Sequence, residues 1–422
     1  MHLLKPRKLL IALAVIAIVI AGALLIAQDQ ETLRVRTPLA ASDAAFPEYL
    51  ARLLGAPLTN GDAYVVHTDG PASFAAMLDA INEAEHRVSF ETYVYNSGLV
   101  ADRFTAAFEA AARRGVNVRL VLDSIGAQGI DSDHVDRLEA AGCQVAWFNE
   151  VAGLGIEETN YRTHRKSLVV DGARAFVGGI GIADYWNHAT ERGPMWRDTM
   201  VEVRGPAAVY IEGSFNENWI ESGEVVEPDL LPHDDKPAGT ARSIVVWSGP
   251  EGGASGMKLL YLLSMGSARR TLDIQTSYLV TDESTEWSLT EAARRGVKVR
   301  LLLEGDITDA KPVKFAGRAV YERLLERGIE IYEYQPAMMH AKVLVVDGTL
   351  SVIGSANLDN RSLELNDELN VAVFDPSLAE RLLEDFERDL RKSTRIDLDE
   401  WRARPLHISA REKLWSLFGE VF

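Results

Sequence analysis

The amino-acid sequence predicts an α/β protein of two tandem domains, each a mixed sheet flanked by helices, related by pseudo-two-fold symmetry and preceded by a transmembrane helix. Three observations lead to this prediction. The chain has 422 residues, more than one hydrophobic core usually serves. It contains an internal repeat in which strand-like and helix-like segments alternate. It also begins with a long apolar run.

The transmembrane helix is predicted within residues 1–28, which we interpret as an N-terminal membrane anchor. Residues 9–27 form an unbroken apolar run of 19 residues. As a helix rising about 1.5 Å per residue, this run spans close to the roughly 30 Å hydrocarbon layer of a bilayer. A cleaved signal peptide is the alternative, because Ala21 and Ala23 are small, but both lie inside the run instead of after it.

The charges around this run predict its orientation. Three positive residues precede it, namely Lys5, Arg7 and Lys8. Arg34 and Arg36 follow it among acidic residues, so the positive bias is small. Because positive charge favours the cytoplasmic side, we expect a cytoplasmic amino terminus and a body on the other side of the membrane.

The domains are predicted from the repeat. Residues 109–123 (EAAARRGVNVRLVLD) recur as residues 291–304 (EAARRGVKVRLLLE), each a helix ended by glycine and then a strand. A second helix ended by glycine recurs as RLEAAG at 137–142 and RLLERG at 323–328. Each domain is therefore predicted to run strand, helix, strand, helix, strand, and then a hairpin.

The domain boundaries follow from composition. We predict the first domain over residues 45–220 and the second over residues 243–397. Between them, residues 221–242 hold three prolines and several acidic residues, as is typical of a linker. Residues 398–422 form a C-terminal tail in which apolar residues recur at helical spacing, so the tail could lie on lipid or pack on the body.

The predicted hairpins carry a short polar motif that is present twice. HRKSLVVD at residues 164–171 recurs 176 residues later as HAKVLVVD at residues 340–347. Of the nine histidines, only the two that open these segments stand in this frame. Two copies with the same spacing favour a functional pair of histidines over apolar hairpins with incidental polar residues.

The residue types of the motif suit phosphodiester chemistry without a metal. A neutral imidazole can attack phosphorus, a second histidine can protonate the leaving oxygen, and lysine can hold a phosphate oxygen. Side chains two apart share one face of a strand, so His164 projects with Lys166, and His340 with Lys342. Because neither domain holds two such pairs, we expect the site where the domains meet.

Asp171 and Asp347 complete the two motifs, and we include them among the catalytic candidates. Each lies at an odd offset from its histidine and is followed by glycine, as in an Asp-Gly turn that closes a hairpin. By this parity both aspartates are expected to organise the turn more than to touch substrate.

On these residues the chain resembles the phospholipase D superfamily, and within it the bacterial cardiolipin synthases. The resemblance covers roughly residues 45–395, beginning near FETY at 90–93 and including WRDT at 196–199 and GSANLDNRS at 354–362. It implies two phospholipase D-type domains and a covalent phosphohistidine. One histidine takes the phosphatidyl group, and the other protonates the departing alcohol and deprotonates the acceptor. By analogy with the family we assign His164 as nucleophile and His340 as acid and base.

The resemblance also implies orienting carboxylates. In related enzymes a carboxylate downstream of the motif, not the motif aspartate, orients each imidazole. The matching positions are Glu368, which we assign to His340, and Asp198, which we assign to His164.

The resemblance implies a lopsided phosphate site as well. The first copy of the family usually carries asparagine where this chain has Gly181, whereas the second copy keeps Asn357. We therefore expect Ser355 and Asn357 to contribute more to phosphate binding than the first loop. Tyr93 and Tyr278 follow matching strand ends and could contact lipid or lie half buried in the sheet.

Charge and composition narrow the substrate class. The formal net charge is −18, whereas proteins that bind long nucleic acid usually need a basic surface, so a nuclease is disfavoured. A local basic cleft remains conceivable, formed by Arg162, Arg165, Lys166 and Lys342. No His-Glu-x-x-His or Cys-x-x-Cys pattern occurs, so we expect neither a metal nor another cofactor.

The sequence thus predicts a bacterial inner-membrane phosphatidyltransferase of cardiolipin synthase type. The expected partners are the membrane and phospholipids, with phosphatidylglycerol first, and no nucleic acid; the oligomeric state stays open. The alternative is a phospholipase D-type hydrolase, which shares every catalytic residue and differs only in the acceptor. A non-catalytic membrane protein is disfavoured because both motifs are intact.

Overall fold

The structure, a computed structural model, describes four stretches of the chain: residues 32–150, 160–225, 236–249 and 255–419. The predicted membrane anchor and the middle of the predicted linker lie outside these residues. Within the four stretches, no helix combines the length and the hydropathy that crossing a bilayer requires.

The first half alternates strands and helices as the repeat predicts. After α2 (Phe46–Leu54), its elements are β1 (Leu58–Thr68), α3 (Gly70–Glu83), β2 (Arg87–Thr92), α4 (Leu99–Arg113), β3 (Asn117–Asp123), α5 (Ser132–Ala140), β4 (Gln144–Phe148), β5 (Lys166–Val170), β6 (Arg174–Gly178), the 3₁₀ turn η1 (Asp184–Trp186), β7 (Thr199–Arg204) and α7 (Ala207–Glu221). Gly115 and Gly142 follow α4 and α5 with φ of 93° and 96°, which confirms glycine as the end of both helices.

The second half repeats this order. Its elements are β8 (Ala241–Ser248), α8 (Gly256–Ser267), β9 (Thr271–Gln275), β10 (Leu279–Val280), α9 (Glu283–Arg294), β11 (Lys298–Glu304), α10 (Lys311–Arg318), α11 (Tyr321–Glu326), β12 (Glu330–Tyr334), β13 (Val343–Val346), β14 (Leu350–Gly354), β15 (Leu358–Asp359), the π-helical turn η2 (Arg361–Leu365), β16 (Glu368–Phe374), α12 (Pro376–Leu390), β17 (Ser393–Arg395), α13 (Leu398–Arg402) and α14 (Leu406–Ser416). The second half departs from the first in three places: α10 and α11 replace one helix between β11 and β12, β10 and β15 form an extra two-stranded sheet, and β17, α13 and α14 follow α12.

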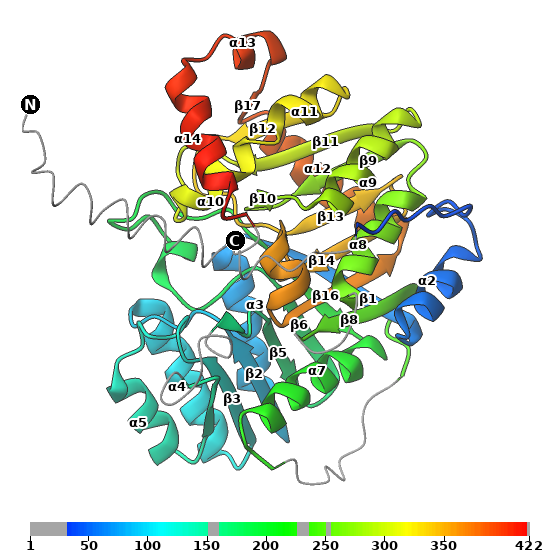
Figure 1. The fold of residues 1–422 in the computed structure, drawn as a ribbon. Coiled ribbons are helices and arrows are strands. Elements are labelled where there is room, and N and C mark those ends of the chain that lie inside the picture. The colour runs from blue at the N-terminus through cyan, green and yellow to red at the C-terminus, as the bar shows by residue number, and fades with distance from the viewer. Residues whose placement is uncertain (1–31, 151–159, 226–235, 250–254, 420–422) are drawn as a thin grey trace, which may run out of the picture.

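The two halves share one 15-stranded mixed sheet (Figure 1). The strand order is β17-β12-β11-β9-β13-β14-β16-β8-β1-β7-β6-β5-β2-β3-β4. The strands β8 and β1 lie at the centre. Outward from β8 the order is β16, β14, β13, β9, β11 and β12, and outward from β1 it is the corresponding β7, β6, β5, β2, β3 and β4. Strand β17 is added at the edge beside β12. This order shows the predicted tandem repeat and its pseudo-two-fold symmetry. The pairs β2-β3-β4 and β9-β11-β12 are parallel, whereas the catalytic hairpins are antiparallel.

Helices cover both faces of the sheet, because successive strand residues face opposite sides. On one face, Val343 and Val345 of β13 pack in a core with α7 and α12 that draws on both halves. On the other face, Leu344 and Val346 join a core of the second half, and an equivalent core with Leu168 fills the first. The layers are thus helix, sheet and helix, and the central core holds the halves together.

Helix α2 lies on the second half, although we predicted the first domain to begin at residue 45. Phe46 and Leu50 belong to the core that contains Met257 and Leu260 of α8. Figure 1 shows α2 (blue) beside α8 (green). Helix α2, which precedes the first half in the sequence, therefore packs on the second half and connects the two halves.

The C-terminal tail contains a helix, as its apolar spacing predicts. Leu414 and Leu417 are 52% and 65% exposed, so this part of the stripe does not pack on the body. The ring of Trp415 lies 6.0 Å from that of Phe418. The other side of the helix is held by Glu412, which is buried and bonded to Arg404 and Arg318.

Candidate active site

The two motif histidines lie just before β5 and β13, in segments that contact the opposite half. The backbone N–H of His164 donates to the carbonyl of Asp367, 2.8 Å away. In the same way the N–H of His340 donates to the carbonyl of Arg197, 2.7 Å away. Each histidine is therefore anchored to the segment that leads into β16 or β7 of the opposite half.

This exchange decides which carboxylate orients each imidazole. His164 Nδ1 lies 2.8 Å from Glu368 Oε1, and His340 Nδ1 lies 2.7 Å from Asp198 Oδ2. Our assignment of Glu368 to His340 and of Asp198 to His164 was therefore wrong. The reason is geometric. Asp198 lies just before β7 and next to the residue whose carbonyl binds the N–H of His340. Glu368 is the first residue of β16 and follows the residue whose carbonyl binds the N–H of His164. A bonded Nδ1 leaves Nε2 as the nitrogen that faces a substrate.

The two carboxylates occupy equivalent positions but have different neighbours. Both are fully buried. The Ser355 hydroxyl donates to Glu368 Oε2, whereas the indole Nε1 of Trp186 donates to Asp198 Oδ2 at 3.0 Å. Ser355 therefore supports a carboxylate, a role that we did not assign to it from sequence.

The lysines lie beside their histidines, as the strand spacing predicts. Lys166 Nζ donates to the carbonyl of His164 at 2.5 Å, and Lys342 Nζ to that of His340 at 2.6 Å. Lys342 also donates to the hydroxyl of Ser277 at 2.7 Å. Burial lowers the pKa of Lys166 to about 7, and the charge of Lys342 acts in the same direction. A phosphate placed here would meet two poorly solvated ammonium groups.

The electrostatics show that both histidine–lysine pairs belong to one site. Burial lowers the pKa of His164 to about 4, with Lys166 and Lys342 contributing, while Glu368 opposes the shift. Burial also holds the pKa of His340 well below its usual range, and Lys342, Lys166 and His164 add to this effect. Groups from each half thus act on the histidine of the other, as expected for a site between the domains.

The pKa values of the two carboxylates shift in opposite directions, although burial acts to raise both. Burial raises the pKa of Asp198 to about 6 despite the nearby charge of Lys342. Burial would also raise the pKa of Glu368, but His164, Lys166 and the Ser355 hydroxyl outweigh it and leave that pKa below its usual value. The two halves are alike in topology and different in electrostatics.

Asp171 and Asp347 lie at the far ends of β5 and β13, in the hairpin turns. Both have positive φ, 52° and 53°, in the left-handed region that aspartate tolerates. The carboxylate of Asp171 accepts from the backbone N–H of Glu85, His86 and Arg87. Asp347 binds the corresponding three N–H groups before β9. At about 3.3 Å per strand residue, each lies roughly 16 Å from its motif lysine, too far for substrate contact.

The two tyrosines singled out from sequence do not occupy equivalent positions. Strand pairing aligns Val88 with Leu272, so Tyr93 corresponds to Ser277 instead of Tyr278. The ring of Tyr93 lies 5.3 Å from that of His164 and its face lies under Lys166 Nζ. Tyr93 therefore borders the site.

Tyr278 is oriented by an acidic residue that sequence reasoning did not identify. Its hydroxyl donates to Asp309 Oδ1 at 2.6 Å. The negative charge of Asp309 acts on the pKa of His340, which it raises against the effect of burial. The loop before α10 therefore also borders the second histidine.

The two glycine loops differ at the positions for which we predict unequal phosphate contacts. Asn357 is 3% exposed, and its Oδ1 has no hydrogen-bond partner among the described residues. At Gly181, a Cβ would lie 3.0 Å from Val94 Cβ and 3.2 Å from the Trp186 ring. The asparagine typical of the family therefore has no room in the first loop.

The two arginines proposed for a basic cleft are bound inside the protein. Arg165 is fully buried and donates to the Ser214 carbonyl and to Glu217. Arg162 donates to the Ser124 hydroxyl and the Asn149 carbonyl. Of the four cationic residues considered, only Lys166 and Lys342 belong to the site, so the predicted four-residue basic cleft is not formed.

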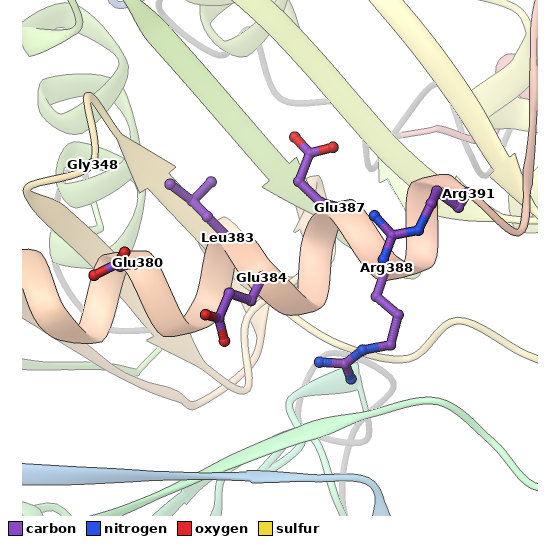
Figure 2. Close-up of a pocket in the computed structure, with 7 residues that line it drawn as sticks. All are labelled: Gly348, Glu380, Leu383, Glu384, Glu387, Arg388 and Arg391. Carbon is purple, nitrogen blue, oxygen red and sulfur yellow. The ribbon is translucent and has the colours of Figure 1, made fainter.

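A hollow of about 620 Å³ lies away from this site, along α12 (Figure 2). Its lining includes Gly348 in the turn between β13 and β14, at the opposite end of β13 from His340. Glu380, Glu384 and Glu387 line it together with Arg388 and Arg391, so the lining carries charges of both signs.

Aromatic residues around His340 were missed from sequence. Its ring lies 5.4 Å from that of Trp186 and 5.3 Å from that of Trp196, measured between centroids. One signal was available, because Trp196 stands two residues before Asp198. For Trp186 no spacing rule pointed to the site.

Comparisons with known proteins identify the family. A family model described as "Cardiolipin synthase, PLD-like domain" matches residues 77–219 and 261–390. The chain is 31% identical over 390 residues to the cardiolipin synthase of Geobacillus kaustophilus (strain HTA426), covering 92% of this chain and 78% of that protein. It is 32% identical over 358 residues to cardiolipin synthase 2 of Bacillus anthracis, covering 84% of this chain and 70% of that protein.

A solved structure shares the fold. The phosphatidylserine synthase of Haemophilus influenzae Rd KW20 matches with a TM-score of 0.67 at 13% identity, over 89% of this chain and 100% of that chain. With the family match over most of both halves, the conclusion is direct: this chain belongs to the cardiolipin synthase family with phospholipase D-like domains.

Proposed function

We propose that this protein is a phosphatidyltransferase of cardiolipin synthase type that works through a phosphohistidine. The observation that carries the proposal is the pair of buried imidazoles, each bonded through Nδ1 to a carboxylate of the opposite half. Both are neutral at neutral pH, so either Nε2 can act as nucleophile or base. The named relatives are cardiolipin synthases, which supports a phospholipid as substrate, and we propose phosphatidylglycerol as donor and acceptor.

In the first step, Nε2 of His164 attacks phosphorus and forms an N–P bond, while the bond from phosphorus to the glycerol oxygen breaks. His340 takes up a proton from solvent at Nε2 when the phosphate anion enters, and the departing oxygen then takes this proton. Entry of the phosphate anion raises the pKa of the imidazole that must hold this proton. Lys166 and Lys342 would stabilise the charge that gathers on the non-bridging oxygens.

In the second step, neutral His340 removes the proton from a glycerol hydroxyl of a second phosphatidylglycerol. The new alkoxide attacks phosphorus, the N–P bond breaks, and His164 is regenerated. Asp198 and Glu368 hold both rings in register through the two steps. Water at the same place would give phosphatidic acid, which is the hydrolase alternative.

One incubation tests transfer against hydrolysis. Purified protein is given labelled phosphatidylglycerol, and the lipid products are separated. Cardiolipin with free glycerol supports transfer, whereas phosphatidic acid supports hydrolysis, and no turnover of any phospholipid would contradict the proposal.

The order of the histidines is tested by trapping. We expect a labelled phosphoenzyme to accumulate in H340A, where the acceptor cannot be deprotonated, and not in H164A. Label on H164A alone would reverse the assignment.

We also propose that the protein is held in a bacterial inner membrane by residues 9–27, with its body outside the cytoplasm. The apolar run and the preceding positive charges support this topology. The exposed Leu414 and Leu417 of α14 offer an additional contact with lipid. Protease added to intact spheroplasts should digest the body; protection of the body until the membrane is opened would contradict this topology.

A further inference from the structure

The two halves differ in the donor that supports the orienting carboxylate. Strand pairing makes Gly179 the counterpart of Ser355, since Gly178 and Gly354 occupy the same position of β6 and β14. Glycine has no hydroxyl, so the first half lacks the donor that Ser355 supplies to Glu368. In its place the indole N–H of Trp186 reaches Asp198.

Trp186 and the two glycines fit together. A Cβ on Gly179 would lie 2.4 Å from Asp198 Oδ1, and one on Gly181 would lie 3.2 Å from the Trp186 ring. Trp186 is 1% exposed and is packed against the rings of Tyr185 and Trp196. The indole thus lies where a side chain at Gly181 would extend, and the Asp198 carboxylate that it binds lies where a side chain at Gly179 would extend.

The bond from Trp186 acts on the oxygen that His340 uses. Asp198 Oδ2 lies 3.0 Å from Trp186 Nε1 and 2.7 Å from His340 Nδ1, while Oδ1 accepts the N–H of Thr199 at 2.7 Å. Three donors fix the plane of a fully buried carboxylate, and one of them is the imidazole itself. Without the indole N–H, the hydrogen bond from the Thr199 N–H is the only remaining one of the three that does not involve the imidazole itself.

We propose that Trp186 is a positioning residue, whose indole N–H replaces the hydroxyl of Ser355 in the other half and holds Asp198 in the orientation that His340 requires. Trp186 does not touch the reacting atoms and acts through Asp198. This inference rests on the proposed phosphoryl transfer at the two histidines, and it adds a determinant that the His-x-Lys motif does not contain.

The test removes the N–H and keeps an aromatic ring. We expect W186F to lower kcat roughly 10- to 100-fold, the range for loss of a hydrogen bond to a charged group, with KM nearly unchanged. W196F is the matched control, because Trp196 packs on His340 without donating to Asp198. We expect it to keep the wild-type pH profile.

The pH profile separates positioning from packing. Burial raises the pKa of Asp198 to about 6, and the Trp186 N–H is among the groups that lower it. Without that N–H, Asp198 binds a proton at higher pH and the acidic limb of activity moves upward. The other charged or titratable groups near Asp198 are Lys342, Lys166, Arg197, His340 and Asp69, and neither variant changes them.

A second variant perturbs the same carboxylate without touching the indole. G179A places a methyl group against Asp198 Oδ1, so we expect the same loss of kcat and the same shift of the acidic limb. G213A is its control, since a Cβ there meets nothing within 4 Å. Thermal midpoints identify the folded variants.

Each variant is assayed on phosphatidylglycerol and on a small chromogenic phosphodiester. A folded W186F with wild-type kcat and pH profile would overturn the positioning role, as would a loss of kcat without the pH shift. A wild-type protein that cleaves neither substrate would instead refute the proposed function.

Discussion

The crossed pairing of histidines and carboxylates predicts which double substitutions are coupled. Glu368 is fully buried, lies 2.8 Å from His164 Nδ1 and accepts from Ser355. A hydrogen bond to a charged group contributes about 1.5–3 kcal/mol, so a double-mutant cycle on His164 and Glu368 should give a coupling of about 2 kcal/mol. The same cycle on His340 and Glu368 should give less than about 0.5 kcal/mol.

The assay is urea unfolding of the detergent-solubilised full chain. The variants are E368Q, H164A, H340A and the doubles H164A/E368Q and H340A/E368Q. If E368Q loses about 2 kcal/mol of transition-state stabilisation, its kcat should fall roughly 30-fold. A larger coupling of Glu368 to His340 than to His164 would refute the crossed arrangement, whatever the activities.

Three further predictions follow from single residues. With the pKa of Asp198 near 6 and that of Lys166 near 7, kcat/KM on a soluble short-chain lipid should rise with pH through about 6, above the pKa of His164 near 4, and fall above about 7. K166R should move the falling limb to higher pH because guanidinium stays charged; an unmoved limb would assign it to another group. D347A, which leaves three backbone N–H groups without their acceptor, should lower the free energy of unfolding by about 2–4 kcal/mol in urea titrations while the folded fraction keeps near-normal kcat. G181N restores the family's usual residue, yet it should cost about 1–3 kcal/mol of stability through the contact with Val94, and a raised thermal midpoint would contradict the packing argument.

Much of the fold could be predicted because the helices and strands of the repeat are marked by residues that lie close together in the sequence. The glycines after α4 and α9 end helices by their positive φ, and alternating apolar residues give β5 and β13 their two buried faces. The His-Lys spacing placed both pairs on strand faces for the same reason. These features depend on neighbours within a few residues, which a sequence displays directly.

The partners across the domain boundary could not be predicted in this way. Glu368 follows His340 in the same repeat, so sequence order favoured pairing them, whereas the backbone bond from His164 to Asp367 brings the opposite half's carboxylate instead. The alignment of Tyr93 with Ser277 depended on strand register, and a one-residue offset moved the aromatic ring to another place. The roles of Trp186 and Asp309 arise from contacts that no spacing encodes.

Each half supplies the carboxylate that orients the histidine of the other half, so neither half alone contains a complete histidine–carboxylate pair. A ribosome that has released residues 1–220 has made a histidine, its lysine and Asp198, but Glu368 has not yet been synthesised. Competence to break a phosphodiester thus arrives late in biosynthesis, after both repeats have docked. A truncated or misassembled copy would lack at least one of the two histidine–carboxylate pairs.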